Sequence, residues 1–368
     1  MEVSHWHSDM AQIKIKNVKI KGMAACVPSN IEENSEYPYF DHNEIDKIIP
    51  TIGVERTRRA RLGETCADYA YKAAVKLIED LGWERDSIGL IMYVSAARDY
   101  IFPDTACIIQ GKLGLPVSTM AFDMTLGCTG WTHGMTVAGN LLQTGNIKRA
   151  LLLNGMMATQ ENCYEDKTTW PLFSDAGVAT ALEYDESASP IWCELGTIGK
   201  NYSDVMIPDG GRRNPVTADS MVLKEYGTNI KRTRLHQEMK GMEVFAFGLR
   251  TAPASIDAVL NFAGKTMNDV DMFVFHQANY YLIKKIVKKA KLDPEKVPIS
   301  MKNFGNVGPC CIPFAMVTER AEQLRHGKCH VIGNAFGVGM SWGSLYFETE
   351  NLVIPDLIEF EEGDEKAI

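Results

Sequence analysis

Two kinds of apolar segment recur along this chain, and their order predicts its architecture. Residues 66–83 carry apolar side chains at helical spacing, and residues 87–95 (SIGLIMYVS) then form the short apolar run of a buried strand. Residues 247–264 repeat the helical spacing, and a second apolar run, MFVFH, ends at His276. The repeat predicts two halves built alike, with Ser95 and His276 at equivalent strand ends.

A second pair of segments supports the duplication. Residues 123–155 contain a short strand, a turn at Cys128, a helix rich in small residues, a glycine stop and a buried strand. Residues 300–337 contain the same series, with Asn306 at the turn. Glycine just beyond a helix is an expected terminator because it adopts the left-handed backbone conformation without strain. Cys128 and Asn306 are therefore expected at corresponding positions of two related units.

The alternation of strands and helices predicts an α/β fold with largely parallel sheets, in which functional groups collect at strand ends and helix starts. Two duplicated βαβαβ-type halves are expected to pack as layered α/β/α/β/α. The first is predicted to span residues 12–185 and to carry Cys128, and the second to span residues 190–348. Residues 349–368 are expected to form a partly ordered acidic tail, and residues 1–11 to be disordered.

Composition narrows the class of protein. A hydrophobic content of 45% and a charged content of 23% are those of an ordinary globular protein, and a net charge of -9 argues against nucleic-acid binding. The nine cysteines lack CxxC spacing, which argues against a metal site or a disulfide framework. No apolar run is long enough for a membrane span or a secretory signal. The sequence therefore predicts a cytoplasmic protein with free thiols, no metal and no cofactor.

Cys128 is the candidate nucleophile. Acyl transfer through a covalent intermediate needs a thiol that ionises readily, and a helix N-terminus favours the thiolate. Gly127 and Gly130 leave room for a substrate carbonyl beside Cys128, whose own backbone N–H can face the oxyanion that forms. The other eight cysteines fit the simpler interpretation of small buried residues.

His276 and Asn306 are the candidate partners of this nucleophile. Taken singly, a histidine at a strand end is usually structural, and asparagine is common in turns for conformational reasons. Together they suit one chemical step, because both donate hydrogen bonds to a thioester oxygen and so stabilise the enolate left when a malonyl group loses carbon dioxide. A cysteine hydrolase would instead need its histidine as a base and a water route to the acyl-enzyme.

At these residues the chain resembles the β-ketoacyl-acyl carrier protein synthase III family, over residues 13–347. The family's features occur in order as PTIGVERTRRA, FPDTACIIQGKLG, DMTLGCTG, FSDAGVATAL, IPDGGRRNP, HQAN, FGNVGPCCIP and FGVGMSWGS. The resemblance implies a thiolase-like fold. It also puts the family's catalytic cysteine, histidine and asparagine at Cys128, His276 and Asn306.

The resemblance further implies the reaction and the acyl site. Cys128 takes an acyl group from a thioester, and a malonyl-carrier extender is then decarboxylated and condensed to a 3-oxoacyl product, as in fatty acid biosynthesis. The backbone N–H groups of Cys128 and Val338 form the oxyanion hole, with a valine where the family has a glycine. The family works as a homodimer, in which Phe102 of one subunit closes the other's acyl pocket; Ala158 is expected in the same pocket.

Recognition of the acyl donor depends on further positions. Under the resemblance, the basic segment after His276 becomes a docking face for the acidic acyl carrier protein, with Lys285, Lys288 and Lys289 as contacts. The tryptophan and arginine that hold the adenine of coenzyme A in the family are not evident, and lysines lie near those places. A carrier thioester is therefore favoured over a coenzyme A thioester. The departures from the family pattern are Lys47, Lys167, Met242 and Tyr281.

Three other functions stay open at this point. The nearest is an acyltransferase of the same fold that passes the acyl group to an alcohol or amine, although retention of Asn306 favours condensation because simple transfer has no enolate to stabilise. A non-catalytic partner subunit is a second alternative, which the intact triad argues against. A cysteine hydrolase is the weakest, because the duplicated plan gives no reason to expect water as the acceptor.

Overall fold

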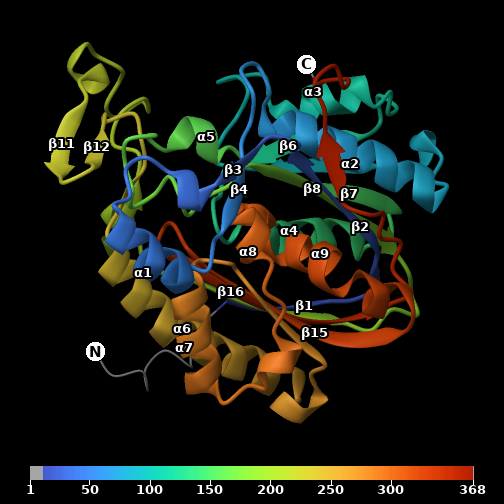
Figure 1. Cartoon of the computed structure of the whole chain (residues 1–368). Helices are drawn as coiled ribbons and strands as arrows, with labels where there is room; N and C mark the ends of the chain where they lie inside the picture. Colours follow the sequence, from blue (N-terminus) through green and yellow to red (C-terminus); the bar gives the residue numbers. More distant parts are fainter. Residues whose placement is uncertain (1–10, 368) are drawn as a thin grey trace.

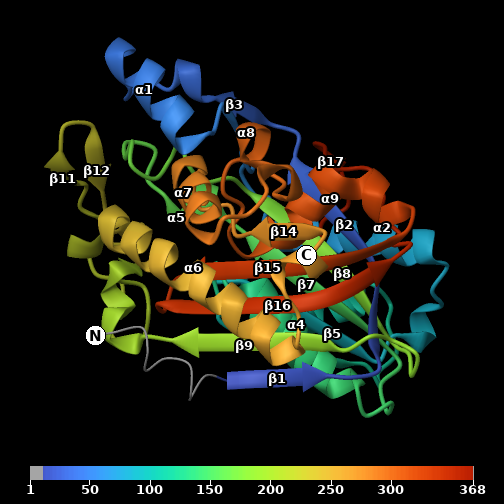
Figure 2. The ribbon, with the colours of Figure 1, turned by 90° about the horizontal axis from the view of Figure 1, so that it is seen from below.

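A computed structural model describes residues 11–367, which form five stacked layers. One sheet lies on each side of a central pair of helices, and further helices cover the outer face of each sheet (Figure 1). The view from below shows helix α6 (Gly241–Ala263) crossing the outer face of the second sheet (Figure 2). The predicted layered α/β/α/β/α arrangement is confirmed.

The first sheet has six strands in the order β17-β2-β8-β7-β5-β6. Its strands are β17 (Ile358–Phe360), β2 (Val18–Pro28), β8 (Ala176–Tyr184), β7 (Arg149–Met156), β5 (Leu90–Val94) and β6 (Met120–Met124). Strand β5 is buried along its whole length and lies parallel to both β6 and β7. An entirely apolar strand such as LIMYV is expected in a sheet covered on both faces.

The second sheet has five strands in the order β1-β9-β16-β15-β14. Its strands are β1 (Ala11–Ile15), β9 (Ile191–Thr197), β16 (Ser341–Glu350), β15 (Lys328–Gly337) and β14 (Met272–Phe275). The run β14-β15-β16-β9 repeats the run β5-β7-β8-β2 of the first sheet in both strand order and pairing sense, which is parallel, antiparallel, antiparallel. The duplication expected from the apolar pattern is therefore present in the topology.

The expectation of largely parallel sheets holds only in part for the first sheet and is wrong for the second. Both sheets are mixed, and in the second only β14 and β15 are parallel. Strands β15 and β16 pair from Gly337 with Ser341 onward, so that only three residues separate them. A parallel pair needs a crossover of a dozen or more residues, whereas a tight connection of this kind reverses the chain and makes the pair antiparallel.

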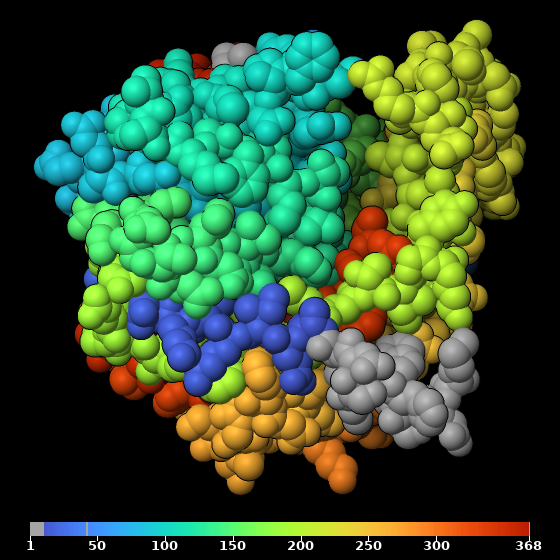
Figure 3. All heavy atoms as spheres, turned by 180° about the vertical axis from the view of Figure 1, so that it is seen from behind, coloured from blue at the N-terminus to red at the C-terminus, as the bar shows by residue number. Residues whose placement is uncertain are grey.

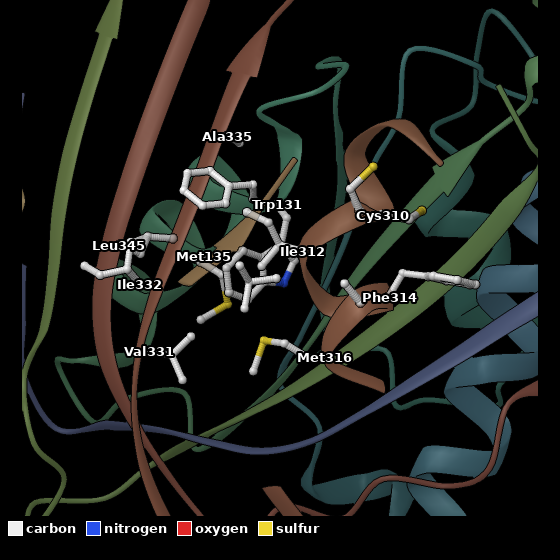
Figure 4. Close-up of a cluster of buried hydrophobic side chains, with 14 of the residues drawn as sticks. Trp131, Met135, Cys310, Ile312, Phe314, Met316, Val331, Ile332, Ala335 and Leu345 are labelled. Atoms are coloured by element: carbon white, nitrogen blue, oxygen red, sulfur yellow. The ribbon is translucent and has the colours of Figure 1, made fainter. Parts of the chain in front are cut away.

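The central layer consists of α4 (Gly130–Leu142) and α9 (Cys311–Arg325), which contact both sheets. Figure 4 shows Trp131 and Met135 of α4 gathered with Ile312 and Met316 of α9 in one buried cluster. Small residues allow α4 to approach the sheet closely, since a Cβ at Gly134 would lie 2.8 Å from a methyl group of Leu152. This close packing fixes the starts of both helices, where the candidate site residues lie.

Helices cover the outer faces, and shorter elements complete the chain. The first sheet is covered by α2 (Cys66–Leu81) and α3 (Thr105–Lys112), and the second by α6, against which α7 (Tyr280–Ala290) packs. Helix α2 ends at Gly82, which adopts the left-handed conformation. The remaining elements are α1 (His42–Ile52), α5 (Ala158–Glu161), α8 (Met301–Phe304) and three small antiparallel pairs: β3 (Ile31–Glu33) with β4 (Arg56–Arg58), β10 (Val205–Met206) with β13 (Glu238–Met239), and β11 (Lys224–Gly227) with β12 (Ile230–Arg232).

Each end of the described chain pairs with the sheet of the opposite half. Strand β1 precedes the first half but pairs with β9 in the second sheet, while β17 follows the second half but pairs with β2 in the first. Ion pairs hold the C-terminal segment, with Glu359 bonded to Arg58 at 2.8 Å and Asp364 to Lys72. The predicted acidic tail thus contains a strand packed on the first half. The segment expected to be disordered lies outside the described residues, except for Ala11 at the start of β1.

Candidate active site

Cys128 lies in the turn between β6 and α4. The turn is closed by the Gly130 N–H, which donates to the Gly127 carbonyl at 2.8 Å, and α4 begins at Gly130. Gly337, at the end of β15, faces the nucleophile so closely that a Cβ there would lie 2.6 Å from both Cβ and Sγ of Cys128. The thiol is therefore fixed between the start of one central helix and the end of a strand from the opposite sheet.

The Cys128 thiol and the His276 imidazole form a charged pair. Burial would raise the pKa of Cys128, but the charge of His276, a hydrogen bond from its ring and the backbone N–H groups of Val338 and Cys128 outweigh this and lower it. Burial would likewise lower the pKa of His276, but the sulfur atoms of Cys128 and Cys311 raise it well above the usual value. Each group thus favours the ionised form of the other, and the thiolate is the nucleophilic form.

His276 follows the last residue of β14, as predicted. Its backbone N–H donates to the Asn334 carbonyl at 2.8 Å, and its ring meets Phe336 edge to face at 5.9 Å between centroids. The side chain is buried, and its Nδ1 has no hydrogen-bond partner within the described part of the chain. A histidine that works as a base in a hydrolase is oriented by a third group at that nitrogen, and no described residue takes this role.

Asn306 is oriented by its neighbours so that its amide nitrogen is left for a ligand. The Gly308 N–H donates to Asn306 Oδ1 at 2.9 Å, and the Cys311 thiol donates to the same oxygen at 3.4 Å. The backbone of Asn306 is paired with Leu172, whose carbonyl accepts from the Asn306 N–H at 2.8 Å. Since both side-chain contacts come from donors, the oxygen is assigned to their side and Nδ2 to the other.

Cys128, His276 and Asn306 line one cavity of about 70 Å³, here called the catalytic cavity, at whose rim α7 begins. A second cavity of about 220 Å³, here called the acyl cavity, lies on the other side of Cys128. Cys128, Phe173, Val205, Gln237 and Val338 line both cavities. Figure 3 shows the surface hollowed between the first-half residues drawn in teal and the loops drawn in yellow-green. Cys128 therefore lies where two cavities meet.

The remaining predicted residues of the oxyanion hole and acyl pocket lie as follows. The Val338 N–H reaches Cys128 Sγ, next to the predicted oxyanion position. Phe102 is 79% exposed and does not line the acyl cavity of its own chain. Ala158 is fully buried at the start of α5 and does not line the cavity either, because its side chain packs into the core; the neighbouring Met157 and Glu161 take that place.

The predicted carrier contacts lie on α7, which buries its apolar face against the second half. Lys288 is exposed, and within the described residues no ion pair holds it. Lys285 lies over the ring of Tyr281 at 4.9 Å, and Lys289 donates to the Leu249 carbonyl at 3.1 Å. The lysine-rich face thus begins next to the mouth of the catalytic cavity.

Two of the other positions that depart from the family pattern have structural partners. Lys167 forms an ion pair with Glu44 at 2.6 Å, which holds α1 against the loop after α5. Tyr281 stacks on Phe245 at 5.7 Å between centroids. Lys47 and Met242 are exposed.

Sequence reasoning missed three residues of the site. Cys311 places a second sulfur beside His276 and Asn306, and Glu161 and Gln237 place polar groups in the acyl cavity. Cys311 follows Asn306 by five positions, and its sequence context indicates only a small buried residue. Glu161 and Gln237 lie in polar stretches whose composition is typical of loops. Their separation from Cys128 in the sequence gives no sign that they share its site.

Known proteins resemble this chain in both sequence and fold. Models of the 3-oxoacyl-(acyl-carrier-protein) synthase III family match residues 122–199 and, for its C-terminal part, residues 260–349. The first match contains Cys128, and the second contains His276 and Asn306. The solved 3-oxoacyl-(acyl-carrier protein) synthase of Burkholderia xenovorans superposes with a TM-score of 0.90 at 33% identity, covering 96% of this chain and 100% of the other. The predicted thiolase-like fold is confirmed.

Curated relatives extend the likeness over nearly the whole chain. The protein named beta-ketoacyl-(acyl-carrier-protein) synthase III in Symbiobacterium thermophilum is 30% identical over 336 residues, which cover 90% of this chain and 98% of the relative. Its namesake in Syntrophomonas wolfei is 30% identical over 331 residues, with 89% and 96% covered. Fold and site define an acyl-transferring condensing enzyme. The chain belongs to the 3-oxoacyl-(acyl-carrier-protein) synthase III family.

Proposed function

We propose that this enzyme acylates Cys128 from a thioester and condenses the acyl group with a malonyl-carrier extender. The observation that carries the proposal is the single cavity lined by Cys128, His276 and Asn306, with a charged thiolate–imidazole pair and an amide nitrogen turned to a ligand. In the first step the Cys128 thiolate attacks the thioester carbonyl. The oxyanion accepts from the Cys128 and Val338 N–H groups, and its collapse expels the donor as a thiolate.

The second step uses the other two side chains. The bond between the malonyl carboxylate and its α-carbon breaks, carbon dioxide leaves, and the electron pair moves onto the thioester oxygen. His276 and Asn306 Nδ2 donate to this oxygen and stabilise the enolate. The α-carbon then attacks the acyl-enzyme carbonyl, and expulsion of the Cys128 thiolate releases the 3-oxoacyl-carrier product.

The acyl carrier protein is the proposed partner that delivers these thioesters. Leu282 and Asn279, at the start of α7, line the catalytic cavity, and the same helix presents the lysine-rich face. An acidic carrier held on that face brings its thioester to the cavity mouth. Lys167 does not offer a free charge for the phosphates of coenzyme A, because it is paired with Glu44.

A second copy of the chain is the proposed partner at the acyl cavity. Ser95 and Ala96 line the cavity, and the loop that follows them exposes Tyr100, Ile101 and Phe102 in succession. Consecutive exposed large apolar residues are typical of an interface. The Phe102 of a partner subunit would then close the acyl cavity.

None of the helices formed by residues 11–367 has the length and apolar character of a membrane span.

The division of labour between the residues is tested with two variants. In Asn306→Ala, decarboxylation of malonyl-carrier should fall by about a hundredfold, as is typical when one oxyanion donor is removed, while acylation of Cys128 continues. Cys128→Ala should block acylation and retain decarboxylation. Intact-mass spectrometry measures the first reaction, and release of labelled carbon dioxide the second. Equal loss of both reactions in Asn306→Ala would contradict the proposal. His276→Ala is less selective, because His276 also supports the thiolate.

A further inference from the structure

The acyl cavity is mostly apolar, but two polar side chains line it. Glu161, the last residue of α5, and Gln237, which precedes β13, share the cavity with Cys128. The Gln237 N–H donates to the Glu161 carbonyl at 2.8 Å, so the two residues are neighbours although they lie far apart in sequence. An alkyl chain on Cys128 would meet polar groups here instead of the uniformly apolar wall that suits it.

Gln237 presents a donor that no described residue uses. Its side chain is only 9% exposed, and its Nε2 has no hydrogen-bond partner within residues 11–367. A buried donor that stays unpaired is costly, so native proteins rarely retain one without a ligand, a water or a function for it. Gln237 lines the acyl cavity as well as the cavity shared by Cys128, His276 and Asn306, and an acceptor on a ligand in the acyl cavity would give this amide a partner.

Glu161 presents a carboxyl group that is equally unused. A second carboxyl group nearby, that of Asp175, accepts from the Ala60 N–H at 2.6 Å and from the Thr159 N–H at 2.9 Å, as well as from the Thr159 hydroxyl. No hydrogen bond or ion pair reaches the carboxyl group of Glu161 from the residues that the structure describes. The difference shows that Asp175 is a structural acid, whereas Glu161 faces the cavity without a structural partner.

We propose that the acyl group carried by Cys128 bears a hydroxyl group, which accepts a hydrogen bond from Gln237 Nε2 and shares another with Glu161. This inference rests on the proposed function, because it assumes that Cys128 carries an acyl group into this cavity. A hydroxyl group can accept and donate at once, and so can satisfy both side chains. An amine offers only donors in its charged form, and a carboxylate offers only acceptors.

The ionisation of Glu161 supports a hydroxyl over a charged group. Burial, together with the negative charges of Asp175 and the Cys128 thiolate, raises the pKa of Glu161 to about 7. Near neutral pH the carboxyl group is therefore present in both forms. A hydroxyl group can donate to the ionised form and accept from the protonated form. Glu161 and Cys128 line the same cavity, so the hydroxyl belongs a few carbons from the thioester.

The experiment compares pairs of thioesters that differ only in a hydroxyl group. Butyryl, valeryl and hexanoyl thioesters of N-acetylcysteamine are each matched with hydroxylated forms in which the hydroxyl is placed successively further from the carbonyl. Single-turnover acylation of the full-length enzyme is followed by intact mass. We expect the best hydroxyacyl thioester to react at least about tenfold faster than its alkanoyl partner, because a site with unpaired polar groups discriminates against ligands that leave them unpaired.

Variants separate this inference from the function on which it rests. Glu161→Leu should reverse the preference, and Glu161→Gln should keep part of it because the amide still forms hydrogen bonds. Glu84→Leu makes the same change on the exposed surface and should leave the ratio unaltered. If Glu161→Leu does not fold, the wild-type ratio and Glu161→Gln decide.

Equal or faster reaction of the alkanoyl thioesters would overturn the inference and leave the proposed function standing. Preference for aminoacyl or carboxyacyl thioesters of the same length would overturn the hydroxyl assignment. If no thioester of any kind, carrier thioesters included, acylates Cys128, the proposed function fails and the inference falls with it.

Discussion

Gly337 and Cys128 lie so close together that a single methyl group should displace the nucleophile. In Gly337→Ala the new Cβ would lie 2.6 Å from Cys128 Sγ. Non-bonded carbon and sulfur atoms need roughly 3.5 Å or more, so one of the two groups must move by about 1 Å. The second sheet holds Gly337 through its pairing with Ser341 in β16, whereas Cys128 lies in a turn. The movement should therefore fall mainly on the nucleophile.

The expected loss follows from this movement. A misplacement of about 1 Å at a reacting atom costs on the order of a hundredfold in rate. Acylation of Cys128 by a thioester should slow by this amount in Gly337→Ala when it is followed in single turnover by intact mass. Decarboxylation of the malonyl thioester should change less, because His276 and Asn306 carry that step. Overpacking should also cost about 1 to 3 kcal/mol of stability, which thermal unfolding measures.

A helical glycine without close neighbours provides the control. Gly111 lies near the end of α3, and a Cβ there would meet no atom within 4 Å. Gly111→Ala should therefore leave acylation unchanged and should not destabilise the protein. An acylation rate for Gly337→Ala within about twofold of wild type, in a protein that unfolds at the normal temperature, would refute the argument that this close contact positions the thiolate.

Two further predictions concern charge. The lowered pKa of Cys128 means that its alkylation by iodoacetamide should stay fast below about pH 8.5, where an ordinary thiol is mostly protonated; His276→Ala should move the midpoint of the rate profile upward, and an unmoved midpoint would contradict the ion pair. Replacing Lys288 by glutamate should raise the apparent Michaelis constant for an acyl carrier thioester, and added salt should weaken the wild-type interaction by screening. The exposed Lys265, outside α7, offers the control Lys265→Glu, and identical carrier kinetics in both variants would rule out docking on α7.

The fold could be predicted where local pattern and packing agree. The helical spacing of residues 66–83 became α2, and the apolar run before Ser95 became β5, because each segment buries the face that its pattern marks. The C-terminal segment could not be predicted in the same way. Its acidic composition conceals Phe360, which is buried against Tyr69 at 5.3 Å between ring centroids. Residues 358–360 form the strand β17 because they pair with the edge of β2, which lies more than 300 positions earlier in the sequence.

The residues of the candidate site likewise fall into those that the sequence predicts and those that it does not. Cys128, His276 and Asn306 could be predicted because each lies where a regular element begins or ends, and the sequence marks such places with glycine and with a change of hydrophobic period. Glu161 and Gln237 could not, because long-range packing of loops sets their positions. The unpaired Nε2 of Gln237 becomes visible only when every neighbour of that atom is known.

The duplicated fold explains how the one proposed nucleophile can serve two substrates. Ser95 and His276 lie at equivalent strand ends, but Ser95 donates to the Gly155 carbonyl at 2.9 Å and lines the acyl cavity, whereas His276 faces the catalytic cavity. Cys128 and Asn306 lie at the equivalent helix starts. The first half thus forms much of the cavity proposed for the acyl group, and the second half supplies the two donors proposed for the enolate. Because the central helices bring these equivalent ends together, Cys128 reaches both cavities, and the acyl group need not move between the two steps.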